Sequence, residues 1–236
     1  MRLAPVLLLV GACSLPPAAP APATPAPVPG AALYGIPGEA MIYEVRLRGV
    51  RVARIEVAAG KLGWIDGHRA LIVRSRGRTD GMLALVTDIT YELTTTLDLD
   101  AGHPLRDSER AQVIFEGKQD RTHQERQWSA RDIARGVHDL HSAAAALRGW
   151  RDAGHATRLE VAIDDTTFGV ALAETRRELV RHMPAIRYDG LARERFPFTV
   201  WISDDAARVP LGVHATTKWG DIDAVLVEYD PPRDDG

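Results

Sequence analysis

The sequence predicts a mainly β fold, which we expect to be an antiparallel β-barrel, half-barrel or sandwich of about ten strands with one short helix. Three observations predict this class. Apolar and polar side chains alternate along most of the chain after residue 37, as is typical of strands with one face in a core. Turn-forming residue pairs separate these segments. One alanine-rich stretch, residues 142–148, lacks the alternation and favours a helix.

The first twelve residues indicate a signal peptide. Residues 3–10 are mostly apolar, and the small residues Gly11 and Ala12 precede Cys13, the only cysteine of the chain. An apolar run this short cannot cross a bilayer as a helix, which needs about twenty residues, but it fits a secretory signal. The stretch from Val10 to Cys13 resembles the bacterial lipobox, so we expect cleavage before Cys13 and lipidation of its thiol. The alternative is an ordinary secretory signal that happens to contain a cysteine.

Residues 13–36 are predicted to form a tether rich in proline and alanine. Between residues 15 and 31 a proline occurs every two or three positions and polar side chains are nearly absent, so extended polyproline-like chain is favoured. At about 3.1 Å per residue it would hold the domain about 50 Å from the membrane. Ser14 resembles the residue that follows the cysteine in lipoproteins sent to the outer membrane. We therefore expect a lipid-anchored protein in the bacterial cell envelope, facing the periplasm at the outer membrane.

Composition and motif searches narrow the function classes for residues 37–230, the expected β-rich domain. The chain has 236 residues and a formal net charge of −3, so we expect no nucleic-acid partner. It contains no phosphate-binding loop, no dinucleotide fingerprint, no H-E-x-x-H motif and no paired cysteines. The missing motifs argue against a nucleotide enzyme. Together with the expected lipid anchor, the fold class and the lack of a catalytic constellation, they lead us to expect no cofactor, no metal ion and no enzymatic activity.

The strands are predicted in order from the alternation. The domain opens with a hairpin, because Met41, Tyr43 and Val45 face one way, Gly49 breaks the run, and the alternation resumes over residues 53–57. Further strands are predicted at 69–75, 86–97, 105–115, 121–128, 158–163, 168–179, 198–202, 209–217 and 222–229. Turns are predicted at 66–67, 101–104, 164–165, 189–190 and 219–220.

The helix is predicted from about residue 140 to about residue 150, because its residues are strong helix formers. Asp139 is placed to cap its first turn, and Gly149 and Gly154 lie near its end. A lone helix in a strand-rich domain often plugs a barrel mouth or covers a sheet.

Three stretches together resemble a bacterial family called domain of unknown function 3108. They are residues 37–43, Pro-Gly-Glu-Ala-Met-Ile-Tyr; residues 137–142 with Arg148 six positions on; and residues 198–205 followed by Val209-Pro210. The resemblance covers about residues 37–230 and implies an exported β-rich domain found in envelope proteins, with no established activity or catalytic residues. Ala144 to Ala146 stand where helices of that family often carry bulky aromatic residues.

The densest group of reactive side chains is His138, Asp139, His141 and Ser142. Helix capping by Asp139 is the favoured interpretation. A metal site would need a third ligand such as His155 or Asp152. A nucleophilic role for Ser142 would need a histidine base and an oxyanion hole, and no G-x-S-x-G elbow surrounds it.

Other candidate residues also have two interpretations. Asp139, Ser142 and Trp150 are candidates for ligand binding or for helix capping. The pairs Asp164-Asp165 and Asp204-Asp205 are expected at tight turns rather than in acid/base or calcium chemistry. Most aromatic residues are expected to fill the core, and the alternative is a cavity for an apolar guest; they are Tyr43, Trp64, Tyr91, Trp128, Trp150, Trp201 and Trp219.

Three functions stay open at this point. The first is a non-enzymatic envelope lipoprotein that binds an apolar or amphipathic, lipid-like ligand or a partner protein of the envelope. The second is an envelope hydrolase that uses the cluster from His138 to Ser142. The third is a structural module that scaffolds an assembly.

Overall fold

The structure is a computed structural model that describes residues 36–150, 156–163 and 166–232. The predicted signal peptide and all but the last residue of the predicted tether lie outside the described residues, as do Cys13 and the turn at 164–165. The predicted mainly β class is confirmed. The count of about ten strands is wrong, because thirteen strands occur among the described residues, and so is the expectation of one helix, because two α-helices and a 3₁₀ turn are present there.

The strands are β1 (Ala40–Leu47), β2 (Val50–Ile65), β3 (His68–Thr79), β4 (Thr87–Asp98), β5 (Pro104–Phe115), β6 (Lys118–Gln127), β7 (Val137–His138), β8 (Ala156–Ile163), β9 (Thr166–Val180), β10 (Met183–Ala192), β11 (Phe196–Ser203), β12 (Pro210–Thr217) and β13 (Gly220–Asp230). The helices are α1 (Ala130–Ala134) and α2 (Leu140–Gly149), and the 3₁₀ turn η2 is Leu83–Leu85. The helix predicted at about 140–150 is therefore α2.

All thirteen strands belong to one sheet, in the order β6-β5-β4-β3-β2-β1-β13-β12-β11-β10-β9-β8-β7. Strands β1 to β6 form one meander and β8 to β13 form another, and the two halves of the sheet meet where β1 pairs with β13. The sheet does not close into a barrel, since β6 and β7 lie at its two ends. Every pairing is antiparallel except the short parallel contact of β7 with β8.

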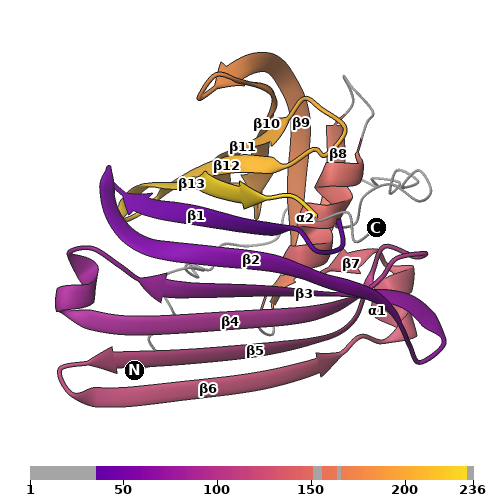
Figure 1. The fold of residues 1–236 in the computed structure, drawn as a ribbon, viewed down its shortest axis with the longest axis horizontal. Helices are drawn as coiled ribbons and strands as arrows, with labels where there is room; N and C mark the ends of the chain where they lie inside the picture. Colours follow the sequence, from indigo (N-terminus) through magenta and orange to yellow (C-terminus); the bar gives the residue numbers. More distant parts are fainter. Residues whose placement is uncertain (1–35, 151–155, 164–165, 233–236) are drawn as a thin grey trace.

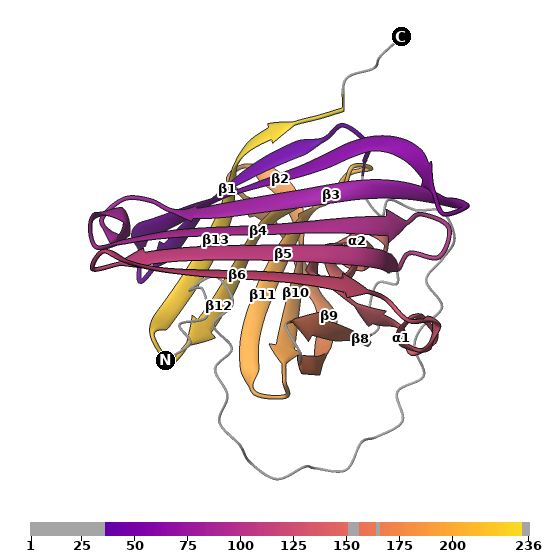
Figure 2. The ribbon, with the colours of Figure 1, turned by 90° about the horizontal axis from the view of Figure 1, so that it is seen from below.

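The sheet is strongly twisted and bends around α2. Figure 2 shows strands β2 to β6 running across the view while β9 to β13 run nearly at right angles behind them. Helix α2 lies in the hollow between the two halves (Figure 1). The helix thus covers the concave face of the sheet, as one of the sequence interpretations expected.

Small side chains let α2 approach both halves closely. Ala145 packs with Leu71, Val73 and Leu97 of one half. Two residues on, Leu147 packs with buried residues of β9 to β11 in the other half. Because Ala145, Ala146 and Ser142 are buried, a bulky aromatic side chain in this stretch would push the helix away from the sheet. The alanines are therefore what fits the helix to this concave face.

The predicted turn at Asp189-Gly190 is wrong, because both residues lie inside β10. Gly190 pairs with Phe198 of β11, and a Cβ placed on Gly190 would lie 2.3 Å from the ring of Phe198. The Asp189 carboxylate accepts a hydrogen bond from Thr199 at 2.7 Å. Glycine here makes room for a ring packed across the strand, a role that a one-dimensional pattern does not distinguish from a turn.

Edge strand β6 is built almost entirely of polar side chains, and nearly all of them are exposed. Charged residues on an edge disfavour pairing with a strand of another molecule, because each new neighbour would have to desolvate them. At the end of β6, Trp128 packs with Val137, Ala162 and Ile133 of α1. This small cluster bridges the two ends of the open sheet on one side.

Candidate functional site

Helix α2 carries a buried polar network at each of its ends. The amino-terminal network comprises Ser75, Thr95, Asp139, His141 and Ser142. The carboxy-terminal network comprises Glu39, Arg148, Tyr188, Ala207 and Arg208. Buried polar groups need hydrogen-bonding partners to offset the loss of water, so the partners of each network define what it can do.

The amino-terminal network begins with a capping box. The Asp139 carboxylate accepts from the Ser142 backbone amide at 2.8 Å and from the Ser142 hydroxyl at 2.7 Å, while the Ser142 hydroxyl oxygen accepts from the Asp139 amide at 3.0 Å. These bonds satisfy two amides that the helix itself leaves free. Asp139 is therefore the N-cap of α2. Ser142 is fully buried and bonded within the cap, which argues against it as a nucleophile.

A chain of hydrogen bonds continues from the cap into the sheet. Thr95 of β4 donates its hydroxyl proton to Asp139. His141 Nδ1 lies 2.8 Å from the same hydroxyl oxygen, and its Nε2 lies 3.1 Å from Ser75 Oγ of β3. Since the Thr95 proton is already donated, His141 Nδ1 carries the proton and Nε2 accepts from Ser75.

Burial lowers the pKa of His141, and the nearby Asp139 opposes this shift without cancelling it. The imidazole is accordingly neutral at neutral pH, as the tautomer assignment requires. A neutral imidazole that accepts from a serine hydroxyl can also take its proton. The pair of Ser75 and His141 is the most reactive arrangement in this network.

A second histidine lies beside the cap. His138 of β7 stacks on His103, with ring centroids 4.8 Å apart. Burial and the neighbouring His103 lower the pKa of His138 to about 4. His138 and His141 thus point to different neighbours. Within the described ranges no group of three His, Cys, Asp or Glu side chains is arranged to hold a metal ion, and the third ligands considered, Asp152 and His155, lie outside them.

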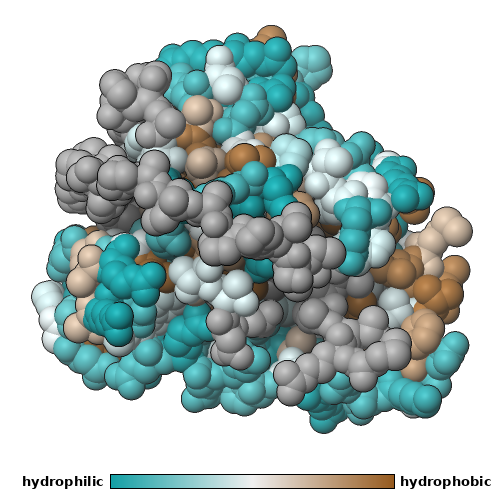
Figure 3. All heavy atoms as spheres, turned by 180° about the vertical axis from the view of Figure 1, so that it is seen from behind, coloured by the Kyte–Doolittle hydropathy of each residue, from teal (hydrophilic) through white to brown (hydrophobic). Residues whose placement is uncertain are grey.

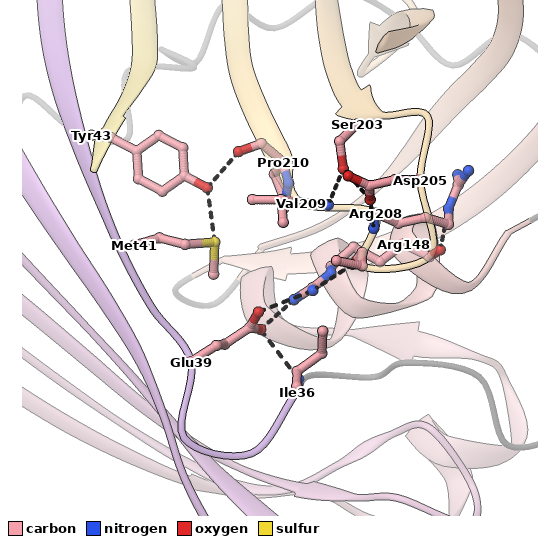
Figure 4. A network of polar contacts seen from close by, with 11 residues as sticks. Ile36, Glu39, Met41, Tyr43, Arg148, Ser203, Asp205, Arg208, Val209 and Pro210 are labelled. Atoms are coloured by element: carbon pink, nitrogen blue, oxygen red, sulfur yellow. Dashed lines mark hydrogen bonds and ion pairs between the residues drawn. The ribbon is translucent and has the colours of Figure 1, made fainter. Parts of the chain in front are cut away.

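The carboxy-terminal network centres on a buried ion pair (Figure 4). The guanidinium of Arg148 donates to both carboxylate oxygens of Glu39, and to Ala207 O at 2.8 Å. Arg148 is 4% exposed and Glu39 is 2% exposed. Glu39 Oε1 also accepts from the Ile36 amide at 3.2 Å. One side chain of α2 therefore ties the start of β1 to the segment between β11 and β12.

Arg208 holds the last turn of α2 from the other side. Its Nε donates to Arg148 O at 2.6 Å, and its Nη2 donates to Trp150 O at 3.0 Å and to Tyr188 Oη at 2.7 Å. Carbonyls at a helix C-terminus lack intrahelical partners and carry partial negative charge, so an arginine is well suited to them. The Trp150 ring lies 5.3 Å from that of Tyr188.

The turn that presents Arg208 is itself held by an acidic residue. Asp205 accepts from the Ser203 hydroxyl at 2.8 Å and from the Arg208 amide at 3.0 Å. Asp204 makes an ion pair with Arg177 at 3.0 Å. The pair Asp204-Asp205 thus lies at a turn between β11 and β12, where the sequence places it.

Two hollows in the surface lie near the two ends of α2. The amino-terminal hollow, of about 130 Å³, is lined by Tyr91, Leu93, Asp107, Glu109, Gln124, Glu125, Arg126, Asp139, Leu140, Ala162 and Ile163. The carboxy-terminal hollow, of about 410 Å³, is lined by Glu174, Arg177, Ile186, Tyr188, Asp204, Asp205, Ala206 and Arg208. Sites for small molecules generally have volumes of about 300–1,000 Å³, so the second hollow is the candidate binding site.

The carboxy-terminal hollow is amphipathic and rich in acid. Ile186 and Tyr188 are buried side chains beneath it, and three carboxylates and two guanidinium groups surround them. Arg177 is paired with Glu174 and Asp204, and Arg208 is bonded to α2. The hollow exposes many polar groups and little apolar surface, so it favours a ligand with hydrogen-bond donors and a small apolar part.

The candidate residues named from the sequence are divided between the two ends of α2. Asp139 and Ser142 lie in the amino-terminal network, and Asp139 also borders the smaller hollow. Trp150 follows the last turn and contacts Tyr188, so the structure does not bring the three residues together. Among the aromatic residues, Tyr43, Tyr91 and Trp128 are buried, whereas Trp64 is 75% exposed.

Sequence reasoning missed Glu39, Ser75, Thr95 and Arg208 as members of these networks. Glu39 and Arg148 both stand in stretches that carry the family resemblance, but nothing in one sequence pairs residues 109 positions apart. Arg208 lies in an apparently ordinary turn. The sequence shows two aspartates shortly before Arg208. The positive φ of Arg208, which marks it as unusual, can be seen only in the structure.

Comparisons with known proteins agree with the fold. The model of a family described as "Protein of unknown function (DUF3108)" matches residues 42–227. A crystal structure of a β-barrel-like protein of domain of unknown function DUF1849 from Brucella abortus is similar, with 10% identity, a TM-score of 0.51, and coverage of 83% of this chain and 98% of that one. At this identity the likeness concerns the fold alone. No match was found among curated proteins.

Two further solved structures share less of the geometry. The crystal structure of MucB matches with 13% identity and a TM-score of 0.34, over 84% of this chain and 56% of that one. A protein from Bacteroides fragilis NCTC 9343, described as exported and with a YmcC-like fold, matches with 8% identity and a TM-score of 0.34, over 85% of this chain and 99% of that one. In the part of the chain that the structure describes, no helix is long and apolar enough to span a membrane.

Proposed function

Because the chain belongs to the DUF3108 family, for which the resemblance implies an exported envelope domain without established activity, we propose that it is a non-enzymatic lipoprotein of the bacterial cell envelope that binds an amphipathic ligand. The observation that carries the proposal is the carboxy-terminal hollow, where buried Ile186 and Tyr188 lie beneath a border of charged side chains. The anchor is Cys13, which follows a short apolar segment and would hold the domain at the membrane.

A wholly apolar guest fits this domain less well. The concave face of the sheet, where such a guest would lie, is filled by α2 through Ala145 and Leu147. Opening that face would break the ion pair between Arg148 and Glu39. Leaving either charge buried without its partner costs about 3–5 kcal/mol. The open hollow beside Arg208 needs no such displacement, so it is the better binding site.

Native mass spectrometry tests the proposal. The domain from residue 32 onward would be purified from a periplasmic extract without detergent, and its native mass compared with its denatured mass. We expect a retained mass of lipid-like size that disappears in the variant Ala206→Trp, since Ala206 is exposed and borders the hollow. The control is Ala101→Trp, which places the same ring on an exposed turn that borders neither hollow. A bare mass for the wild type would favour a scaffold that binds a partner protein.

A specific contact favours a second function, hydrolysis. Ser75 Oγ lies 3.1 Å from Nε2 of the neutral His141, and Thr95 connects that imidazole to Asp139. A serine, a histidine and an acid in series are the components of a serine hydrolase. The nucleophile would then be Ser75 in place of Ser142. Against this function, neither hollow is lined by Ser75 or His141.

A serine-reactive fluorophosphonate probe separates the two functions. A hydrolase would be labelled in the wild type and in Ser142→Ala, and labelling would be lost in Ser75→Ala. The binding function predicts no labelling of any of the three proteins, while the ligand mass in native spectra is the same for Ser75→Ala and wild type. Labelling that depends on Ser75 would contradict the non-enzymatic proposal.

A further inference from the structure

An apolar tip lies at the end of the sheet where β3 turns into β4. We define the apolar tip as Met82, Leu85 and Val86 together with Phe115 of the neighbouring β5. These side chains are 71%, 83%, 62% and 44% exposed, respectively. Figure 3 shows the molecule from behind, with apolar residues gathered at its right-hand edge. This edge is the end of the sheet that lies at the left of Figure 1.

The tip is held firmly by the strands beneath it. The Asp80 amide donates to Val52 O at 2.8 Å, and the Asp80 carboxylate pairs with Arg51 at 3.3 Å. Gly81 has a φ of +61°, and a Cβ there would lie 2.6 Å from Arg51 O. Thr79 Oγ1 donates to Thr87 O at 3.1 Å, which closes the base of the turn. The apolar side chains are therefore exposed by a fixed backbone.

The turn is suited to an apolar environment. From Gly81 to Val86 the sequence is Gly-Met-Leu-Ala-Leu-Val, without a charged or polar side chain. The amides of Leu85 and Val86 donate within the turn, to Met82 O at 3.2 Å and to Leu83 O at 3.1 Å. Backbone groups that enter lipid must be satisfied internally, and the 3₁₀ turn satisfies these two.

The shape and composition of the tip fit a lipid surface better than a protein. Protein interfaces draw most of their binding energy from Trp, Tyr and Arg side chains seated in complementary pockets. The tip projects from a turn at the end of a sheet, and three of its four side chains are aliphatic. Lipid requires only apolar area and no complementary shape. Flanking charges have both signs, with Glu116 in the β5–β6 turn and Lys118 at the start of β6, so burial rather than charge would drive insertion.

The chain outside the structure is long enough to allow this contact. Cys13 precedes Ile36 by 23 positions, which span at most about 80 Å when extended. Ala40, at the start of β1, pairs with Ala58, and Thr79, at the base of the tip, pairs with Ala53. This offset of five residues along β2 corresponds to about 17 Å. An anchor at Cys13 would therefore let the tip reach the same membrane when the tether lies along the surface instead of extending away from it.

We infer that the apolar tip inserts into the membrane interface, so that the domain touches the bilayer at a second point besides its anchor. The inference rests on the proposed membrane location and does not depend on the ligand proposed for the carboxy-terminal hollow. Insertion at the tip would fix how the domain is oriented on the membrane, which a tether alone does not do.

Labelling with an environment-sensitive dye tests the inference on the full chain. Cys13 is the only cysteine, so the double variant Cys13→Ser, Leu85→Cys carries one thiol, which takes a nitrobenzoxadiazole label. The control carries the label at Trp64→Cys. Trp64 is similarly exposed, and it lies near the end of β2 that is far from Ala53, the residue that pairs with the base of the tip. Residues 1–12 stay in both proteins and contribute equally to vesicle binding. Thermal unfolding checks that both variants fold.

Vesicles of phosphatidylethanolamine and phosphatidylglycerol provide the membrane. We expect the probe at position 85 to shift its emission to the blue and to be quenched by spin-labelled acyl chains, also at high salt. The probe at position 64 should instead be quenched by iodide from the water. An aqueous signal at position 85, whether or not the protein floats with the vesicles, would overturn the inference. So would a signal that stays aqueous on vesicles but changes with an envelope protein extract, which would indicate a protein partner.

A second variant guards against an effect of the dye. In flotation assays, Met82→Ser, Leu85→Ser and Val86→Ser together should weaken vesicle binding at least about tenfold, because three apolar side chains no longer leave water. The matched pair Leu62→Ser and Trp64→Ser should leave binding unchanged. Equal losses in both would indicate general stickiness and would also overturn the inference.

Discussion

The two ends of α2 are held by different chemistry. At the carboxyl end, Arg148 and Arg208 bind Glu39 and the last carbonyls of the helix, in a network with formal charges of both signs. At the amino end, hydroxyl groups and a neutral imidazole surround the single carboxylate of Asp139. Both networks join α2 to the sheet, but they should respond differently to mutation and to pH.

The difference follows from which groups can change their charge. An arginine stays protonated at any ordinary pH, so Arg148 and Arg208 keep their charge over the pH range in which histidines titrate. Burial lowers the pKa of the histidines near the amino end and so keeps them neutral in the folded chain. Acid that would protonate them therefore favours the unfolded state. The four predictions that follow test this contrast, from the largest expected effect to the smallest.

The largest effect is expected for Arg148→Met. It leaves the Glu39 carboxylate buried without its partner, which should lower the free energy of unfolding by about 3–5 kcal/mol, as measured by urea denaturation. The double variant Glu39→Gln, Arg148→Met removes the stranded charge and should recover a large part of that loss. If the double variant were as unstable as the sum of both single variants, the ion pair would not be what couples these residues.

The next effect is a loss of stability in acid. The folded chain protonates His138 only near a pKa of about 4, whereas the unfolded chain does so near 6.5, so the unfolded state binds more protons between these values. The contribution of His138 to the free energy of unfolding is therefore fully present above about pH 6.5. It falls by up to about 3 kcal/mol as the pH is lowered to about 4.

The variant His138→Phe should flatten this pH dependence. His103 and His141, whose pKa values burial also lowers, should contribute to the slope that remains. Urea midpoints measured at several pH values provide the test. His123→Phe is the control, because His123 is half exposed on edge strand β6, and it should leave the slope as in the wild type. An unchanged slope in His138→Phe would refute the assignment.

A smaller effect is expected from the cap. Asp139→Ala removes the acceptor of the Ser142 amide and of two hydroxyl groups, and should cost about 2–3 kcal/mol. Ser142→Ala should cost about 1 kcal/mol. Because the two residues bond to each other, the double variant should cost less than their sum. Ser129→Ala, at the N-cap of the five-residue α1, is the matched control and should cost less than Asp139→Ala.

The smallest effect is expected for an exposed ion pair of the same residue types. Arg54 lies 3.6 Å from Glu56 and 3.9 Å from Glu228, and all three side chains are substantially exposed. Arg54→Ala should change the unfolding free energy by less than about 1 kcal/mol, because water already screens these charges. A loss as large as that of Arg148→Met would show that burial is not what separates the two pairs.

Much of the fold could be predicted because burial repeats with a period of two. Met41, Tyr43 and Val45 are buried and alternate with less buried neighbours, as the pattern indicates. Helix α2 begins directly after Asp139. Strand β10 was missed because Gly190 has a packing role that mimics a turn signal. Strand β7, which pairs in parallel with β8, has only two residues, too few to show an alternating pattern in the sequence.

The candidate site was harder to predict than the fold. The sequence identified Asp139 and Ser142 because capping is local, within four residues along the chain. The carboxy-terminal network depends on contacts between residues 39, 148 and 208, which the bending of the sheet brings together. Alternation indicates which face a residue occupies and not which residue lies opposite.

The order of strands has a consequence for the sequence of events in which the chain folds. Strands β1 to β6 pair with their neighbours in sequence, and so do β8 to β13, so each half can form soon after it emerges. The pairing of β1 with β13 joins Ala40 to Asp230 and has to wait for the last segment of the chain. Until then the free edge of β1 is open to wrong partners. Slow closure of this seam should therefore limit the rate at which the domain matures.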